Sequence, residues 1–359
     1  MKILAVNPGS TSTKIAVYED ETPRLVLNIR HSVEELSQFP RIIDQFEFRK
    51  HLVLEALEAN DVPFKFDAIV GRGGIVETHS WRCVCRERCH VGRYAPRHAY
   101  PRLQLRLSDS PRTCRHAARL PLFIADPGVV DELDDVARIT GSPLMPSITI
   151  WHALNQRAIA RRYAAERSAL QPEAPVHYED LNLIVCHLGG GVSVGVHRHG
   201  RAVDVPNALD GFGPFSPERA GTLRRATDRP LSLGALHYRR TEETYFRQGG
   251  TCRPFGTTDI PAIERRIAEG DTHAALVLDA MIYRIAKEIG GAAVVLYGKV
   301  DAILLTGGMA HSEYITSRLQ ERVSFPCSRP RLSRRDELEA LVMNALGALR
   351  GELPVQVYR

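Results

Sequence analysis

The chain has 359 residues and a mass of 40.0 kDa, which is long for a single hydrophobic core and therefore predicts two domains. Hydrophobic residues make up 44% of the sequence and charged residues 25%, a balance that excludes disorder as the dominant state. The best apolar run, from Ala292 to Tyr297, is far shorter than the roughly 20 residues of a membrane-spanning helix. No secretory signal is recognisable, so we expect a cytoplasmic protein with reduced cysteines.

Two β-rich runs at the N-terminus predict a hairpin. The first run covers residues 2–7, breaks at Pro8-Gly9, and is followed by a second run over residues 14–18. The turn between them is small and polar, as is usual in hairpin loops. Since side chains alternate along a strand, one face of the returning strand is expected to carry Ser10, Ser12 and Lys14.

The same pattern returns in the second half of the chain. A run over residues 183–187 ends at Gly189-Gly190-Gly191 and a second run follows over residues 192–196. Two further buried runs, 67–70 and 301–304, each lead into a glycine pair: Gly73-Gly74 in the first half and Gly307-Gly308 in the second. Helix-forming segments at 153–166 and 274–289 separate the strands. These paired units predict a duplicated α/β domain.

Glycine-rich turns can place backbone N–H groups against phosphate oxygens, because no Cβ intervenes. The sequence contains neither a P-loop nor a dinucleotide-binding fingerprint after a strand. Each turn alone could be an ordinary hairpin loop. Their matching positions in the two halves favour binding of a nucleotide's phosphates.

Several long segments resemble the acetokinase family and, within it, the butyrate kinase branch. They are residues 7–14 (NPGSTSTK), 39–50, 151–163, 187–193 (HLGGGVS) and 207–223 (NALDGFGPFSPERAGTL). The resemblance implies two ribonuclease-H-like domains of the actin, Hsp70 and sugar-kinase type, with ATP in a central cleft. We expect an N-terminal domain over residues 1–150, a nucleotide-binding domain over 151–345, and a segment over 346–359 that returns to the first domain.

The resemblance also implies an activity: ATP and Mg²⁺ convert butanoate to butanoyl phosphate, with ADP as the second product. No general base is needed, because a carboxylate is already ionised at neutral pH. Two alternatives are a kinase for a branched acid such as isobutyrate and a damaged, catalytically impaired family member. The implied partners are a small carboxylic acid and further copies of the chain in a homodimer or larger assembly, with no nucleic acid and no membrane.

Family roles transfer to matching positions of this sequence. Arg72 and Arg219 match arginines that bind the carboxylate or the transferring phosphoryl group, and His187 matches a histidine that donates to phosphoryl oxygens. The phosphates would be lined by Asn7, Ser10, Ser12, Lys14, Gly189, Gly190 and Gly191. The adenosine would be contacted by Asp259, Gly307 and Gly308. Glu337 and Asp126 would hold Mg²⁺, although Asp126 could equally cap the turn before Pro127.

Three stretches, 79–119, 224–253 and 323–335, depart from the family pattern. The first contains ten arginines, and six of the seven cysteines fall within the three stretches. A zinc cluster of Cys83, Cys85, Cys89 and His90 has unusual spacing, and a nucleic-acid face lacks interleaved aromatic residues. Displacement of the reading frame explains the composition best. We therefore expect sparse regular structure in 79–119, where His98 is the candidate for a family histidine near the substrate.

Overall fold

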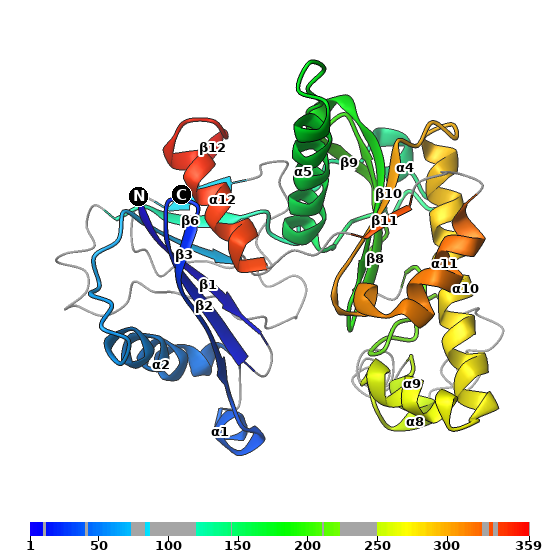
Figure 1. The fold of residues 1–359 in the computed structure, drawn as a ribbon, viewed down its shortest axis with the longest axis horizontal. Helices are drawn as coiled ribbons and strands as arrows, with labels where there is room; N and C mark the ends of the chain where they lie inside the picture. Colours follow the sequence, from blue (N-terminus) through cyan, green and yellow to red (C-terminus); the bar gives the residue numbers. More distant parts are fainter. Residues whose placement is uncertain are drawn as a thin grey trace. The chain divides into compact units, whose positions relative to one another are not determined.

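The chain divides into two compact units (Figure 1). The computed structural model describes residues 1–9, 12–39, 42–72, 83–86, 120–144, 146–209, 212–222, 250–324, 330–332 and 337–358. Unit 1 comprises Met1–Val130 and Asp336–Arg359, and unit 2 comprises Asp131–Arg335. The chain thus enters unit 2 before residue 150, and it returns to unit 1 before residue 346.

Unit 1 contains a sheet with the strand order β12-β5-β6-β4-β1-β2-β3. The predicted hairpin is formed by β1 (Lys2–Pro8) and β2 (Ser12–Glu19), which pair antiparallel, and β3 (Thr22–Arg30) continues the meander. On the other side of β1 lie the parallel strands β4 (Ala68–Arg72) and β6 (Leu122–Ala125). The sheet is completed by β5 (Cys83–Arg86) and β12 (Val355–Tyr358).

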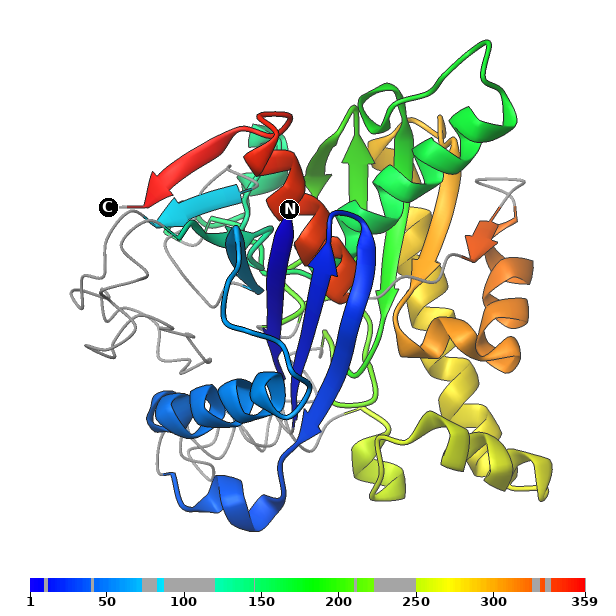
Figure 2. The same cartoon turned by 60° about the vertical axis from the view of Figure 1, so that its left-hand side comes forward.

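The helices of unit 1 bury the sheet's apolar side chains. The segments are α1 (Val33–Ser37), η1 (Ile42–Gln45), α2 (Phe46–Glu58) and α12 (Glu337–Leu349). From α2, Val53 and Leu57 pack against strand residues such as Leu4 and Ile15, and all four side chains are almost completely buried. The apolar helix α12 runs along β1 and β2 (Figure 2). A helix from the far end of the chain therefore covers part of the sheet of unit 1.

Unit 2 repeats the same strand pattern, with the order β11-β10-β7-β8-β9. The antiparallel meander is β7 (Asn182–Leu188), β8 (Val192–Arg198) and β9 (Arg201–Asp204). Parallel to β7 lies β10 (Ala302–Thr306), followed by β11 (Pro330–Leu332). Because β7, β8, β9, β10 and β11 correspond to β1, β2, β3, β4 and β6, the predicted duplication is confirmed.

Helices cover both faces of the second sheet. One face is packed by α5 (Ala153–Leu170), and the other by α10 (Thr272–Val295) and α11 (Glu313–Val323). Shorter segments are α4 (Asp135–Arg138), η2 (Tyr178–Asp180), α8 (Cys252–Phe255), α9 (Ile260–Ala268) and η4 (Gly308–His311). Both predicted helices exist, and both extend beyond their predicted ends.

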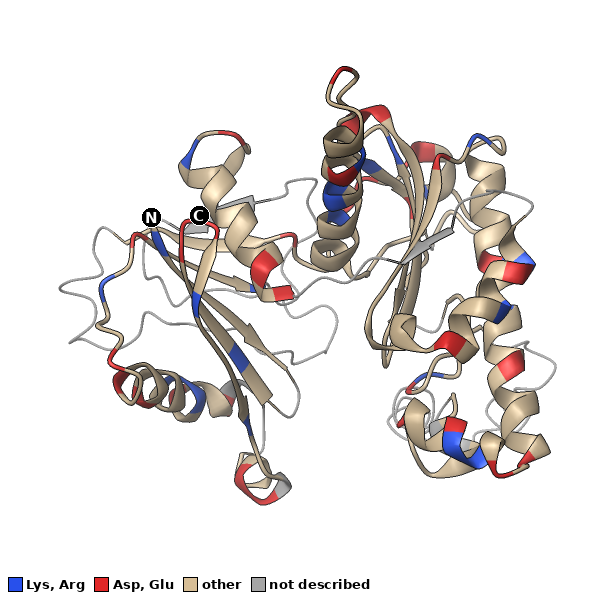
Figure 3. Cartoon of the chain, viewed as in Figure 1, with Lys and Arg blue, Asp and Glu red and all other residues tan. Residues whose placement is uncertain are grey.

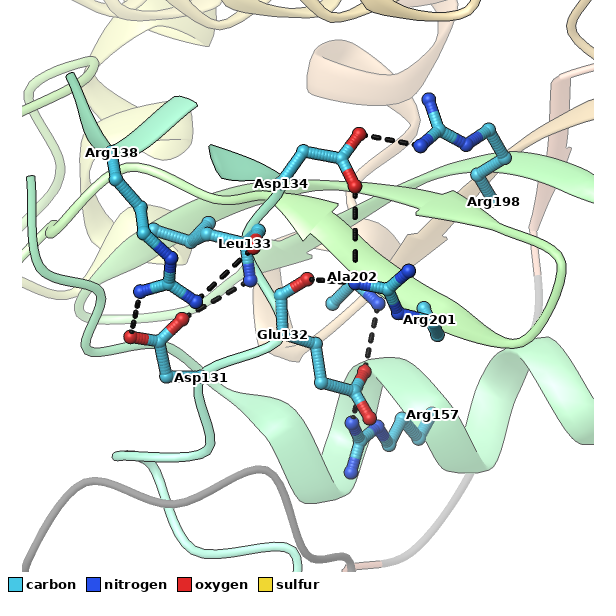
Figure 4. A network of polar contacts seen from close by, with 9 residues as sticks. All are labelled: Asp131, Glu132, Leu133, Asp134, Arg138, Arg157, Arg198, Arg201 and Ala202. Atoms are coloured by element: carbon cyan, nitrogen blue, oxygen red, sulfur yellow. Dashed lines mark hydrogen bonds and ion pairs between the residues drawn. The ribbon is translucent and has the colours of Figure 1, made fainter. Parts of the chain in front are cut away.

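A polar network attaches the start of unit 2 to its sheet (Figure 4). Glu132 Oε2 lies 2.6 Å from Nη2 of the fully buried Arg157 on α5 and accepts the N–H of Ala202 at 2.9 Å. Asp134 accepts a hydrogen bond from Arg198 on β8 at 2.5 Å. A buried ion pair is strongly destabilising to break, since one charge would be left unpaired. These contacts explain why the chain belongs to unit 2 from residue 131 onward.

The structure describes only part of the three stretches that depart from the family pattern. Residues 83–86 form β5, which pairs with both β6 and β12, so this short piece of the first stretch is regular structure. The rest of 79–119, including Cys89, His90 and His98, lies outside the described residues. None of the helices in the described ranges is long and apolar enough to cross a membrane.

Candidate functional site

The carboxyl ends of three parallel strands of unit 1 carry the predicted polar residues. Asn7 lies near the end of β1 and Arg72 is the last residue of β4. Asp126 directly follows β6, whose last residue Ala125 is paired in register with Arg72. Ligands of open α/β sheets usually bind beyond these strand ends. The three residues are therefore placed at one edge of the sheet.

Glu337 joins this group from the other end of the chain. The Asn7 amide nitrogen donates to Glu337 Oε2 at 2.5 Å, and Arg72 Nη1 lies 3.6 Å from the same oxygen. Glu337 is the first residue of α12, where the helix dipole favours a negative charge. Figure 3 shows acidic residues gathered at this end of α12. A carboxylate is thus held beside a guanidinium and a buried amide.

The Asn7–Glu337 pair fits a divalent cation. Asn7 is 5% exposed, and its Oδ1 atom is buried without a hydrogen-bond partner among the described residues. A half-turn of the amide would bring this oxygen toward the carboxylate, and such paired oxygens are suitable Mg²⁺ ligands. Within the described ranges, no cluster of three or more His, Cys, Asp or Glu side chains could hold a metal. Any cation here would therefore need oxygens from phosphate or water as well.

Asp126 occupies a strained turn at the edge of this group. Its side chain is 2% exposed and its backbone has a φ of 38°, which is unusual for a residue other than glycine. This geometry fits both readings of the residue, as a metal ligand and as the turn before Pro127. Its metal role stays a prediction.

The β1–β2 turn is closed by a hydrogen bond from Gly9 N–H to the Ser12 carbonyl at 2.7 Å. Lys14 is the cross-strand partner of Asn7, and its side chain is exposed. Ser10 lies outside the described residues. The described part of the turn therefore agrees with a phosphate-lining hairpin but does not test that role.

A buried arginine stabilises this turn through hydrogen bonds. Arg49 on α2 is 1% exposed, and its Nη1 donates to Gly9 O at 2.9 Å, to Ser12 O at 3.1 Å and to Thr13 Oγ1 at 3.0 Å. Burial lowers the pKa of the guanidinium, which still remains protonated. Sequence reasoning missed this residue, since a polar position on a short helix predicts solvent exposure. Its place in the family-like segment 39–50 is the one signal that could have indicated it.

In unit 2, the three glycines of the β7–β8 turn make room for three neighbouring side chains. A Cβ on Gly189 would lie 2.7 Å from His187 Nε2. A Cβ on Gly190 would overlap the Glu218 carboxylate, and one on Gly191 would overlap the Arg219 guanidinium. Any larger residue would displace one of these groups. The His187 and Arg219 side chains therefore both lie against this turn, while their catalytic roles stay a prediction.

Hydrogen bonds attach the loop that carries Arg219 to this turn. Ser216 Oγ donates to Gly190 O at 2.7 Å, and the Glu218 N–H donates to the same carbonyl at 3.0 Å. The Arg219 N–H in turn donates to Ser216 Oγ at 3.2 Å. Both the backbone and the side chain of the arginine are thus positioned by the glycine turn.

A second histidine, absent from the predicted set, completes this group. The His152 ring stacks on His187 with centroids 3.8 Å apart and planes inclined by 12°. His152 Nδ1 lies 2.8 Å from Ser193 Oγ, and Ser193 is the cross-strand partner of His187. The family-like segment 151–163 contains His152, yet a histidine just before a helix gives no sign of what it contacts.

The predicted adenosine residues occupy two separate positions in unit 2. Gly307 follows β10 with a φ of 90°, and a Cβ there would clash with the backbone of Leu188 at the end of β7. Gly308 begins η4. Asp259 precedes α9, and its exposed side chain lies 3.9 Å from Arg265. Gly307 is thus required by packing, while contact with adenosine stays a prediction.

Comparisons with known proteins agree with this architecture. The acetokinase family model matches residues 160–323. A probable butyrate kinase of Bacteroides thetaiotaomicron is 55% identical over 366 aligned positions that span all of both chains. Another from Phocaeicola vulgatus is 43% identical over 363 positions, covering 100% of this chain and 99% of that protein.

Two solved structures have the same fold at low sequence identity. The acetate kinase of Porphyromonas gingivalis superimposes with a TM-score of 0.67 at 15% identity, covering 97% of this chain and 99% of that one. A propionate kinase of Francisella tularensis subsp. tularensis gives a TM-score of 0.65 at 15% identity, with coverages of 95% and 98%. This protein therefore belongs to the acetokinase family and has its duplicated ribonuclease-H-like fold.

Proposed function

We propose that this protein is a carboxylate kinase that transfers the γ-phosphoryl group of ATP to butanoate, forming butanoyl phosphate and ADP. The observation that carries the proposal is the grouping of Arg219, His187 and the glycine backbone at the β7–β8 turn. Support also comes from the relatives at 55% and 43% identity, which are both described as probable butyrate kinases.

The chemistry requires donors of positive charge and of hydrogen bonds. A carboxylate oxygen of the acid forms a bond to the γ-phosphorus, while the bond from that phosphorus to the β–γ bridging oxygen breaks and leaves its electrons on ADP. Catalysis of phosphoryl transfer is almost entirely positioning and charge stabilisation. Arg219 offers a planar guanidinium and His187 a ring N–H to the phosphoryl oxygens, and the glycine N–H groups hold the neighbouring phosphates.

Unit 1 supplies the second set of proposed ligands. Asn7 and Glu337 would hold Mg²⁺, which when bound neutralises phosphate charge, and Asp126 is the proposed third ligand. Arg72, beside Glu337, would bind the acid's carboxylate or the phosphoryl group. Ser10, Ser12 and Lys14 are proposed for the phosphates, and Asp259, Gly307 and Gly308 for the adenosine.

Acyl phosphate formation tests the proposal directly. Purified protein with Mg-ATP and butanoate should produce an acyl phosphate that hydroxylamine traps as a hydroxamate, and Arg219→Ala should lower kcat by roughly 10²–10³-fold. Arg24→Ala, at a 59% exposed side chain of β3, is the matched control and should retain full activity. Isobutanoate, propanoate and acetate assayed in parallel rank the acyl preference. Absence of hydroxamate with all four acids, in protein that binds Mg-ATP, would refute the proposal and favour an inactive family member.

A further inference from the structure

Behind the stacked histidines lies a fully buried chain of hydrogen bonds. Gln156 on α5 contacts Ser193 on β8 through Nε2, at 2.9 Å to Oγ and 3.1 Å to the carbonyl oxygen. Gln156 Oε1 lies 2.9 Å from His197 Nε2, and His197 Nδ1 lies 2.5 Å from the Tyr178 hydroxyl. Gln156, Ser193 and His197 are all 0% exposed. The chain thus runs from the interior of unit 2 to the hydroxyl that contacts His152.

The Ser193 carbonyl group decides which atom is the donor and which is the acceptor in each of these hydrogen bonds. The Ser193 carbonyl can only accept, so the Gln156 group that faces it must be the NH₂. Gln156 Oε1 therefore faces His197, whose Nε2 must carry a hydrogen. In the neutral ring, His197 Nδ1 then accepts from Tyr178. The orientation of the amide and the tautomer of His197 are both determined.

The same reasoning reaches His152. Ser193 Oγ already accepts a hydrogen bond from Gln156, and it has one hydrogen of its own to donate. Within the described ranges, its acceptor is His152 Nδ1 at 2.8 Å. A neutral His152 ring that accepts at Nδ1 carries its hydrogen at Nε2.

A glycine in the middle of β8 gives independent support. Gly195 pairs with Val185 in the strand interior, where glycine weakens a sheet unless another group needs the space. A Cβ on Gly195 would overlap Gln156 Oε1 and would lie 3.0 Å from His197 Nε2. The hydrogen bond between Gln156 and His197 passes over this glycine.

We propose that Gln156, with His197 and Tyr178 behind it, is a positioning network that fixes His152 as the Nε2–H tautomer beneath His187. The catalytic consequence rests on the proposed function: an N–H donor suits an anionic phosphoryl group, whereas a lone pair would repel it. The stacked pair then offers donors without requiring two adjacent imidazolium charges. Gln156 acts through Ser193 and His152 and is a positioning residue.

Nuclear magnetic resonance of ¹⁵N-histidine-labelled protein tests the tautomer, because protonated and unprotonated ring nitrogens differ strongly in chemical shift. His152→Gln identifies the His152 signals among the 14 histidines. In the unaltered protein, His152 should be protonated at Nε2 and unprotonated at Nδ1. Ser193→Ala and Gln156→Met should move His152 toward the Nδ1–H form. They should also lower kcat about tenfold, which corresponds to about 1.4 kcal/mol, with the KM for ATP changed less than about twofold.

Two milder variants keep the test valid if Gln156→Met does not fold. Gly195→Ala should shift His152 in the same direction by displacing the Gln156 amide, and Tyr178→Phe should give a smaller shift. Gln171→Met makes the same chemical change at the exposed C-terminal end of α5 and should alter neither the spectrum nor kcat. Thermal unfolding of each variant identifies any general loss of folding.

The outcomes separate this proposal from the proposed function. A His152 that is Nδ1-protonated in the unaltered protein would overturn the network, and so would a Ser193→Ala variant with unchanged His152 shifts and kcat. If the protein lacks carboxylate kinase activity, the proposed function fails, while the His152 shifts still decide whether the network fixes the tautomer.

Discussion

The two hairpins of the duplicated fold occupy the same place in their sheets, but a charged side chain stabilises one and a neutral side chain stabilises the other. The β1–β2 turn has one described glycine and is held by the charged guanidinium of Arg49, which donates to three oxygens. The β7–β8 hairpin has three glycines, and the neutral amide of Gln156 supports its second strand. Duplication therefore conserves where a turn lies, while each turn's support follows from the groups it must accommodate.

Replacing Arg49, which supports the β1–β2 turn, is expected to have the largest effect on stability. Arg49→Met would remove the common donor of Gly9 O, Ser12 O and Thr13 Oγ1, and a hydrogen bond to a charged group contributes about 1.5–3 kcal/mol. We expect a loss in the free energy of unfolding on the order of 3 kcal/mol, measured by urea titration, together with weaker Mg-ATP binding. Arg24→Met, at an exposed arginine of β3, is the control and should change stability by less than about 0.5 kcal/mol. A stable Arg49→Met variant would show that the turn supports itself.

Adding a methyl group at Gly191 in the β7–β8 turn should lower catalysis more than stability. The added methyl of Gly191→Ala meets the end of the flexible Arg219 side chain, which can move aside without disturbing the backbone. We expect kcat for acyl phosphate formation to fall roughly 100-fold, as when one charge-stabilising donor is lost, with the Tm nearly unchanged. Gly9→Ala is the matched change in the first turn, where the Cβ would lie 3.2 Å from Ser12 O. Equal activity losses in the two variants would contradict the distinction between the turns.

The two units should also respond oppositely to pH, with a smaller effect. In unit 1, burial and then the charge of Arg49 lower the pKa of His31, whose Nε2 lies 2.9 Å from Thr13 Oγ1. The unfolded chain then binds more protons than the folded one, so this stability is present above pH ~6.5 and is lost as the pH falls through the lowered pKa.

In unit 2, the shifted pKa values make the stability fall as the pH rises. Burial, and then the negative charge of Asp134, raises the pKa of Asp204. Burial, and then the negative charge of Asp204, raises the pKa of Glu288. The folded state here binds more protons, so the stabilisation is complete below pH ~4 and is lost as the pH rises through the raised values. Urea unfolding between pH 7.5 and 4 checks both signs, since His31→Gln should reduce the loss on acidification and Glu288→Gln should stabilise the protein near pH 7. Unchanged pH profiles in both variants would rule out these groups as the cause.

Both hairpins, the strands β4 and β10 and the helices α5 and α10 could be predicted from the sequence, because buried strands form short apolar runs that end at glycine and both helices are long runs of good helix formers. The resemblance supplied Arg72, His187, Arg219 and Glu337, which local pattern alone would not distinguish from surface charges. Arg49 and Gln156 could not be predicted, since a buried polar residue on a helix looks like a solvated one until its partners are known. From the sequence, the glycine turn indicates only close approach of backbone N–H groups to phosphate, whereas in the structure its glycines also make room for neighbouring side chains.

The hydrogen bond between Asn7 and Glu337 joins residues separated by 330 positions. During synthesis, the first hairpin leaves the ribosome long before α12 exists, so unit 1 cannot acquire the helix along β1 and β2 until translation is almost complete. Unit 2, by contrast, is continuous over Asp131–Arg335 and has all of its strands earlier. A free chain truncated after residue 335 should therefore contain a native-like second unit and a first sheet that lacks its α12 cover.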